Sequence, residues 1–227
     1  MSDSIEWLGD HCYEPSMGAP GMRGGVSLTA VRGLPVEDFL RRLGATDAEI
    51  GICGAYRTFD TSTVRAPWTP CMYGTSGEWG YVLEDSGVCA WYQHWTDENP
   101  GAMPRKGEEL VCLHANIAVQ PCWLVYSPGD GSILRAEFRE SILNFSTGDA
   151  EGKAARLDRV MRDNGAVWPG SQDFASAGAW RDFIEQGADK LPGAVWKSVG
   201  ECLGITIARV DVEEGNLPVA LLTDPFA

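Results

Sequence analysis

Apolar residues in the middle of the chain recur at the short spacings that predict β-strands. They alternate with polar residues, or cluster over a few positions, between stretches that favour turns. The segments 85–87 and 128–131 carry the Asp, Ser, Pro and Gly residues that let a chain reverse direction. The pattern predicts an antiparallel meander with strands at residues 79–84, 88–93, 109–119, 122–126 and 132–138.

Before the meander, the spacing predicts one strand and one helix. Residues 26–32 alternate as a strand does, and Pro35 then begins a segment whose apolar side chains at positions 36, 39, 40 and 43 share one helical face. Gly44 follows directly, and a glycine at this place ends a helix in the left-handed conformation. We expect an amphipathic helix that ends at Gly44.

After the meander, helical spacing predominates. Helices are predicted at residues 153–163, 171–186 and 194–203, and a terminal strand pair at 205–212 and 217–222. Strands first and helices later indicate an α+β fold, an antiparallel meander sheet with helices packed on one face and concentrated in the C-terminal third. Residues 1–25 are expected to form a flexible arm and residues 26–227 a single domain.

Three pieces of this order resemble a known family. They are the strand and helix from Leu28 to Gly44, the strand Trp79-Gly80-Tyr81-Val82-Leu83-Glu84, and the late helix that ends Cys202-Leu203-Gly204-Ile205. Together they resemble an uncharacterised actinobacterial domain family, over roughly residues 26–222. The resemblance is one of pattern and implies a bacterial protein, but the family has no established activity. It transfers no functional residue.

Charge narrows the classes of partner. The chain has 32 acidic against 18 basic residues, a formal net charge of −14, and no basic run, so a nucleic-acid backbone would be repelled. A basic protein partner would be attracted, although acidity also serves solubility alone. Seven cysteines in a chain of this length and an N-terminus without signal-peptide features predict reduced thiols and a cytoplasmic protein. No apolar run is long enough to indicate a membrane span.

No catalytic signature stands out in the sequence. If the protein is an enzyme, the first candidates are His94, Asp97 and Glu98, because a histidine with a pKa near 6.5 beside carboxylates can act as a general acid or base. A solvated histidine at a strand end is the simpler interpretation. We expect no cofactor.

A metal site is not predicted either. Cys112 and His114 would project from the same face of a strand, and Cys122 could face them after a turn, but zinc needs three or four ligands and a lone Cys-x-His pair is weak support. Buried free cysteines usually pack as small apolar residues. We therefore expect these three residues to have packing roles.

Tryptophans are the candidates for binding. Trp68, Trp91, Trp95 and Trp123 all belong to the predicted sheet or its approach, where an indole can serve either as core or as an interface anchor. These features favour a non-enzymatic binding or regulatory module for a protein partner, similar to an inhibitor or immunity protein. The alternative is an enzyme or binding protein for a small apolar molecule, held in a Trp- and His-lined pocket between the sheet and the C-terminal helices.

Overall fold

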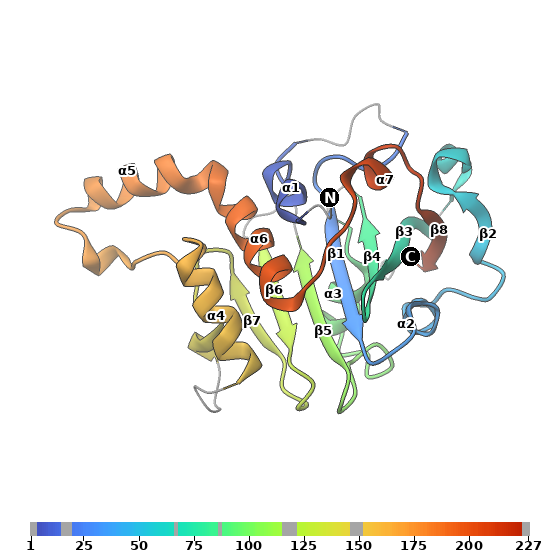
Figure 1. Cartoon of the computed structure of the whole chain (residues 1–227), viewed down its shortest axis with the longest axis horizontal. Helices are drawn as coiled ribbons and strands as arrows, with labels where there is room; N and C mark the ends of the chain where they lie inside the picture. Colours follow the sequence, from blue (N-terminus) through green and yellow to red (C-terminus); the bar gives the residue numbers. More distant parts are fainter. Residues whose placement is uncertain are drawn as a thin grey trace.

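One antiparallel sheet forms the centre of the protein (Figure 1). The computed structural model describes residues 4–14, 20–65, 68–85, 88–114, 122–145 and 152–223. Within them the eight strands have the order β2-β8-β3-β4-β1-β5-β6-β7. Their bounds are β1 Ser27–Arg32, β2 Ile50–Ala55, β3 Trp68–Ser76, β4 Trp79–Glu84, β5 Glu109–His114, β6 Trp123–Ser127, β7 Leu134–Glu137 and β8 Pro218–Thr223.

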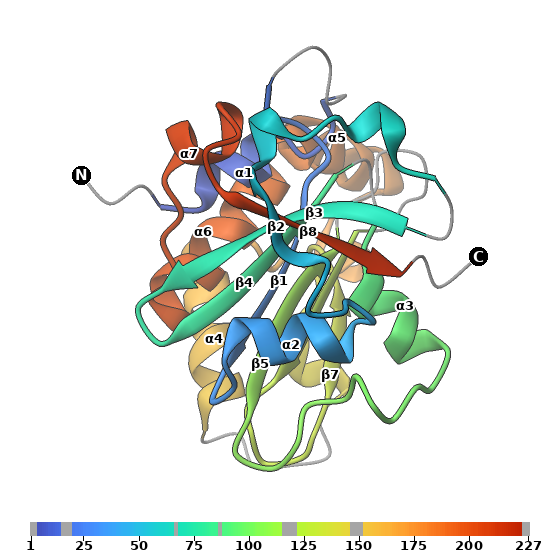
Figure 2. The same ribbon diagram turned by 90° about the vertical axis from the view of Figure 1, so that its right-hand side faces the viewer.

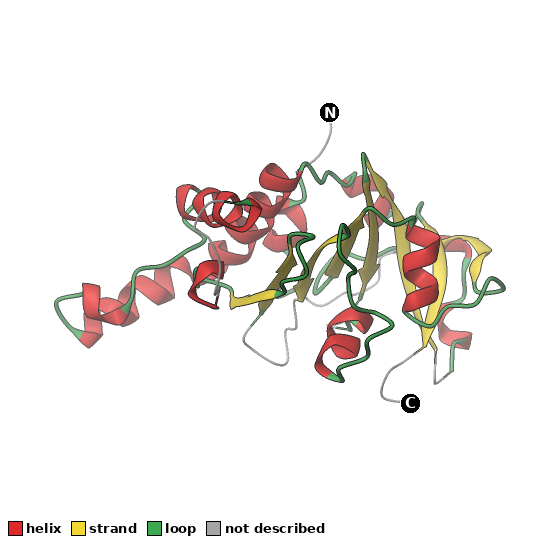
Figure 3. Cartoon of the chain, turned by 90° about the horizontal axis from the view of Figure 1, so that it is seen from below, coloured by secondary structure: helices red, strands yellow, loops and turns green. Residues whose placement is uncertain are grey.

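Helices cover both faces of this sheet (Figure 3). The first core, on one face, includes side chains of α1, α4, α6 and α7, and the second core, on the other face, includes side chains of α2 and α3. Helix α5 belongs to neither core. The helices are α1 Glu6–Asp10, α2 Val36–Arg42, α3 Ala90–Thr96, α4 Lys153–Asp163, α5 Ala177–Gly187, α6 Leu191–Leu203 and α7 Arg209–Glu213.

The predicted α+β class and the antiparallel sheet are confirmed, with two corrections to the arrangement. The helices do not all lie on one face, because α2 and α3 pack on the second. Strands β5, β6 and β7 are neighbours in sequence order, as are β3 and β4, but the meander is interrupted because β1 lies between β4 and β5. Strand β1 is a central strand, hydrogen-bonded to β4 on one side and to β5 on the other, and its residues Ser27 to Val31 are buried.

Two predicted strands are helices in the structure. Residues 90–93 of the predicted strand 88–93 form the first part of α3 instead. Only Ala90 and Trp91 of this helix are buried, and so short an apolar run does not distinguish a helical period from a strand period. Residues 205–212 contain most of α7, with Val212 turned into the first core. The predicted second partner of that pair is a strand, β8, but it pairs with β2 and β3.

The expected flexible arm over residues 1–25 is wrong for residues 4–14. Helix α1 lies against α6, with Ile5 and Leu8 fully buried in the first core. The fit is close at Gly9, where a Cβ would lie 2.6 Å from the carbonyl oxygen of Pro192. Residues 15–19 lie outside the described part of the chain, as do the predicted turn at 86–87, the strand end at 115–119 and the linker at 146–151.

Helix α2 is positioned by a contact with β4. Its apolar face, Val36, Phe39 and Leu40, is buried in the second core, as the spacing predicts. A Cβ on Gly80 would lie 2.7 Å from the Cβ of Val36, so the strand can approach the helix only where it has no side chain. Figure 2 shows α2 crossing in front of the sheet, on the side that carries β2, β8 and β3.

Helix α5 projects from the body as an arm (Figure 1). None of its residues is buried, which is unusual for a helix of this length in a folded protein. Four half-buried rings stabilise it instead, with the ring of Phe183 5.2 to 6.1 Å from the other three. The other rings belong to Trp168, Phe174 and Trp180.

We expect Phe183→Ala to loosen the arm while the sheet keeps its stability, because Phe183 is the only ring that contacts the other three in this cluster. Hydrogen exchange should quicken across residues 174–187 and stay unchanged in β1 and β5. Val210→Ala, an exposed site on α7, is the control. Equal quickening in β1 and β5 would show that α5 is part of the cooperative core.

Candidate functional site

The four tryptophans that the sequence suggests as binding residues lie in different environments. Trp91 is fully buried, and its Nε1 donates a hydrogen bond to the carbonyl oxygen of Ala102 at 3.1 Å, so it is core and not a binding residue. Trp68 is half-buried on β3, away from any ring contact with the other three among the described residues. Trp95 and Trp123 are half-buried and meet at a shared partner, Arg135.

Arg135 is the centre of an aromatic–arginine cluster on the α3 face of the sheet. Its guanidinium carbon lies 3.3 Å from the ring centroid of Trp123 and 5.6 Å from that of Trp95. Tyr92 adds a third ring at 5.8 Å, and its own centroid lies 4.5 Å from that of His114. These five residues, Tyr92, Trp95, His114, Trp123 and Arg135, are called the cluster below.

Strand register assembles the cluster. His114 of β5 pairs with Trp123 of β6, and Arg135 of β7 pairs with Val125, two positions further along β6. Side chains two apart on a strand share a face, so the three strands place His114, Trp123 and Arg135 side by side. Helix α3 lies over this face and supplies the remaining two rings.

Arg135 has cation–π contacts in place of an ion pair. Among the described residues no carboxylate lies within ion-pair distance of it, and its buried Nε has no hydrogen-bond acceptor. A guanidinium over the face of an indole gains about 0.5–2 kcal/mol, depending on how far it is desolvated. Within the described residues, the charge of Arg135 is therefore balanced by ring faces and not by a carboxylate.

The candidate catalytic residues do not come together. His94 lies on α3, where its Nδ1 is 3.0 Å from Nδ2 of Asn99, and no contact joins it to Asp97 or Glu98 within the described chain. Asp97 accepts a hydrogen bond from Gln93 at 2.8 Å, and Glu98 is exposed in a left-handed conformation with φ 55°. The three residues form the C-terminal turn of a helix, without the mutual orientation that acid–base catalysis needs.

The alternative metal ligands are also divided. Cys112 belongs to the second core, where its Sγ lies 3.4 Å from that of Cys89, whereas Cys122 belongs to the first core on the opposite face. His114 stacks on Tyr92. Within the described residues no three His, Cys, Asp or Glu side chains are placed to hold a metal ion.

Glu84 lies beneath α3, the helix that carries two of the five cluster residues. Its carboxylate is buried at the end of β4 and accepts the backbone N–H of Ala90, the first residue of α3, at 2.9 and 3.0 Å. Burial raises the pKa of Glu84 to about 7, and the hydrogen bond from Ala90 only partly offsets that rise. No basic side chain among the described residues forms an ion pair with it.

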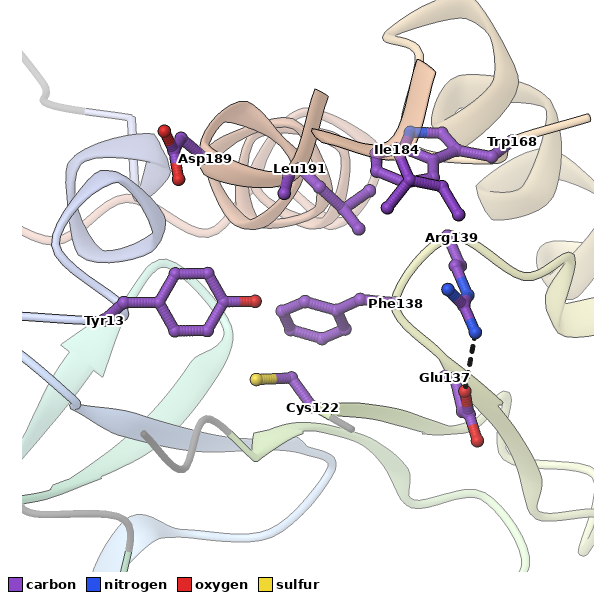
Figure 4. A pocket seen from close by; sticks show the side chains of 10 residues that line it. Tyr13, Cys122, Glu137, Phe138, Arg139, Trp168, Ile184, Asp189 and Leu191 are labelled. Atoms are coloured by element: carbon purple, nitrogen blue, oxygen red, sulfur yellow. Dashed lines mark ion pairs between the residues drawn. The ribbon is translucent and has the colours of Figure 1, made fainter. Parts of the chain in front are cut away.

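A groove of about 450 Å³ opens beneath α5 and the start of α6 (Figure 4). Figure 4 shows the phenol of Tyr13 pointing at the ring of Phe138, with Cys122 below them. Trp168 and Ile184 lie on the far side, close to Arg139. Asp189 lines the groove near Tyr13, and the ion pair of Glu137 with Arg139, at 3.7 Å, lies at the other end.

Several residues of these sites were not predicted from the sequence, although the alternation pattern around one of them, Arg135, indicates its position. Arg135 alternates with apolar Leu134 and Ala136 in the predicted strand 132–138, so it could be placed on the face opposite the first core. Glu84 ended a predicted strand without any sign that it would be buried. Tyr13 and Asp189 come from distant parts of the chain, and only the packing of α1 against α6 brings them together.

Comparisons with protein-family models, curated proteins and solved structures found no match. The resemblance of the sequence pattern to an actinobacterial family therefore stays a prediction. No helix in the described ranges has the length and apolar character to cross a membrane.

Glu84 should make stability depend on pH. Its folded pKa of about 7 exceeds the unfolded value near 4.5, so the folded state keeps the proton to higher pH. The free energy of unfolding should therefore fall as pH rises from about 4.5 to about 7, by on the order of 3 kcal/mol, and level off above. Urea unfolding at pH 5, 6, 7 and 8 measures this dependence.

The difference between the wild type and Glu84→Gln isolates the contribution of Glu84, because other groups titrate in both proteins. Glu78→Gln, on an exposed side chain in the turn before the same strand, is the control and should keep the wild-type slope. Parallel pH curves for wild type and Glu84→Gln would show that Glu84 titrates normally.

Proposed function

We propose that this protein is a non-enzymatic binding module that engages a basic protein partner through the cluster. The observation that carries the proposal is the placement of Trp95, Trp123 and Arg135, half-buried and in contact, at the margin of the second core. Tryptophan, tyrosine and arginine are the residues most enriched at the energetic centres of protein interfaces. The cluster gathers all three types in one place.

Charge supports a basic partner. The net charge of −14 favours association with a positively charged surface. Asp97 and Glu98 are exposed two and three positions after Trp95, just beyond the end of α3. The guanidinium of Arg135 lies against ring faces, whose π electrons offset part of its charge, so it opposes such a partner less than a free arginine would.

A second candidate function is the binding of a small molecule. The groove beneath α5 favours it, since about 450 Å³ is within the range of ligand pockets and Trp168 forms part of its wall. Its position between the sheet and the C-terminal helices agrees with the alternative that the sequence suggests. The residues that line the groove include Trp168 but no histidine, so the lining has the tryptophan that the sequence suggests but not the histidine.

Trp95→Ala should weaken binding of the partner by 10-fold or more, because an anchor in a desolvated interface contributes about 2 kcal/mol. The partner is first captured on immobilised wild-type protein and identified by mass spectrometry, and its affinity is then measured by calorimetry. Support requires one basic protein bound at a fixed stoichiometry.

Trp68→Ala, a half-buried tryptophan outside the cluster, is the matched control and should bind as wild type does. Circular dichroism must show that both variants are folded, and Trp123→Ala replaces Trp95→Ala if the latter unfolds. A partner that binds wild type and both cluster variants equally would place the interface elsewhere.

Asp97→Asn with Glu98→Gln should slow association and leave dissociation nearly unchanged, because exposed charges steer the encounter. The difference should shrink between 0.1 M and 1 M salt, as the Debye length falls from about 10 Å to about 3 Å. Asp182→Asn with Glu185→Gln on α5 makes the same change in charge away from the cluster. If this control slows association as much, steering depends on net charge alone.

A further inference from the structure

The groove beneath α5 has walls of two kinds. Its middle is apolar, with Phe138 and Leu191 buried and Trp168 and Ile184 half-buried. The charged lining residues, Asp189 at one end and the Glu137–Arg139 pair at the other, provide two carboxylates against one guanidinium. The groove therefore offers an apolar body with a surplus of negative charge.

Asp189 is the source of that surplus. It is exposed at the edge of the groove, and no basic side chain forms an ion pair with it in the described ranges. Tyr13 lines the same groove, and the pKa of its phenol is raised by burial and by Cys122 and Cys12, with a smaller contribution in the same direction from the negative charge of Asp189. A carboxylate and an aromatic ring that line the same end of a groove provide the kind of environment that binds ammonium groups.

The opposite end of the groove is preorganised. Arg139 has φ 87°, an uncommon conformation for a residue with a side chain, and its carbonyl oxygen accepts the N–H of Trp168 at 2.9 Å. This bond fixes the backbone that carries the indole of Trp168 in the wall. The guanidinium of Arg139 pairs with Glu137, so it is less available to an anionic ligand than Asp189 is to a cation.

We infer that the groove binds a small amine with an aromatic body. The ring would lie in the apolar middle against Phe138 and Trp168, and the ammonium would lie between Asp189 and the phenol ring of Tyr13. This inference rests on the second candidate function, since it names the ligand class of the same groove. It is independent of the cluster and its protein partner.

The test compares two probes of equal shape. Tryptamine and its alcohol analogue tryptophol share the indole and the two-carbon chain, and only tryptamine is charged at pH 7. Calorimetry on the full chain should show tryptamine binding about fivefold tighter than tryptophol, as one exposed ion pair with a cation–π contact predicts. Asp189→Asn should remove this preference and leave the affinity for tryptophol unchanged.

Asp182→Asn, an exposed aspartate on α5 outside the groove lining, is the control and should keep the preference. Both aspartates are exposed, so neither change should affect folding. Equal affinity of wild type for the two probes, or a preference that survives Asp189→Asn, overturns the inference while the groove remains a small-molecule site. Binding of neither probe overturns the inference, and failure of a wider set of neutral and anionic aromatic probes as well would overturn the small-molecule function itself.

Discussion

The fold depends on one constraint, which is that the central strands are buried on both faces of the sheet. A strand between two cores must be apolar at successive positions, and β4 is buried at all of its residues, from Trp79 to Glu84. The constraint explains why helices lie on both sides and why Gly80 meets α2 without a side chain. It also means that any acidic side chain on these strands has to be compensated inside the protein.

Two buried glutamates, Glu109 and Glu84, are compensated inside the protein to different degrees. Burial would raise the pKa of Glu109 on β5, but hydrogen bonds from Lys153, Tyr126 and Arg32 outweigh it and hold the pKa below its usual range. Among the described residues Glu84 has only the backbone N–H of Ala90 as a donor, and burial raises its pKa. The first glutamate ties α4 to the sheet. The second is an energetic cost beneath α3, the helix that carries two rings of the cluster.

The sequence predicts an element correctly where the pattern of its apolar residues fits either a strand or a helix, but not both. Residues 79–84 and 153–163 match β4 and α4 at both ends, because a short apolar run bounded by turn residues and an amphipathic helix of that length are distinct. The helix at 90–96 could not be told from a strand, since its single buried turn suits either. Strand β3 was not predicted, because Pro70, Gly74 and the polar residues at both of its ends leave too few apolar positions to show a period.

The candidate sites were less predictable than the fold for a related reason. Sequence reasoning identified Trp95 and Trp123 as anchors but could not separate them from Trp91, because burial of an indole depends on what packs above it. The separation comes from Ala102, whose carbonyl reaches back to cover Trp91. In the same way, Asp189 and Tyr13 have no local signal, since neither belongs to a motif and only tertiary packing brings both to one groove.

Strand β7 joins the two proposed sites. Arg135 faces the cluster, and Glu137, two positions on, lines the groove. β7 ends the sheet, and a free strand edge invites pairing with another chain. Here the outward N–H of Glu137 donates to the carboxylate of Glu140 at 3.2 Å, and the carbonyl of Arg139 accepts the N–H of Trp168. These contacts cover the C-terminal end of the edge, so the two proposed sites consist of the aromatic and charged side chains that flank β7 and not of its backbone.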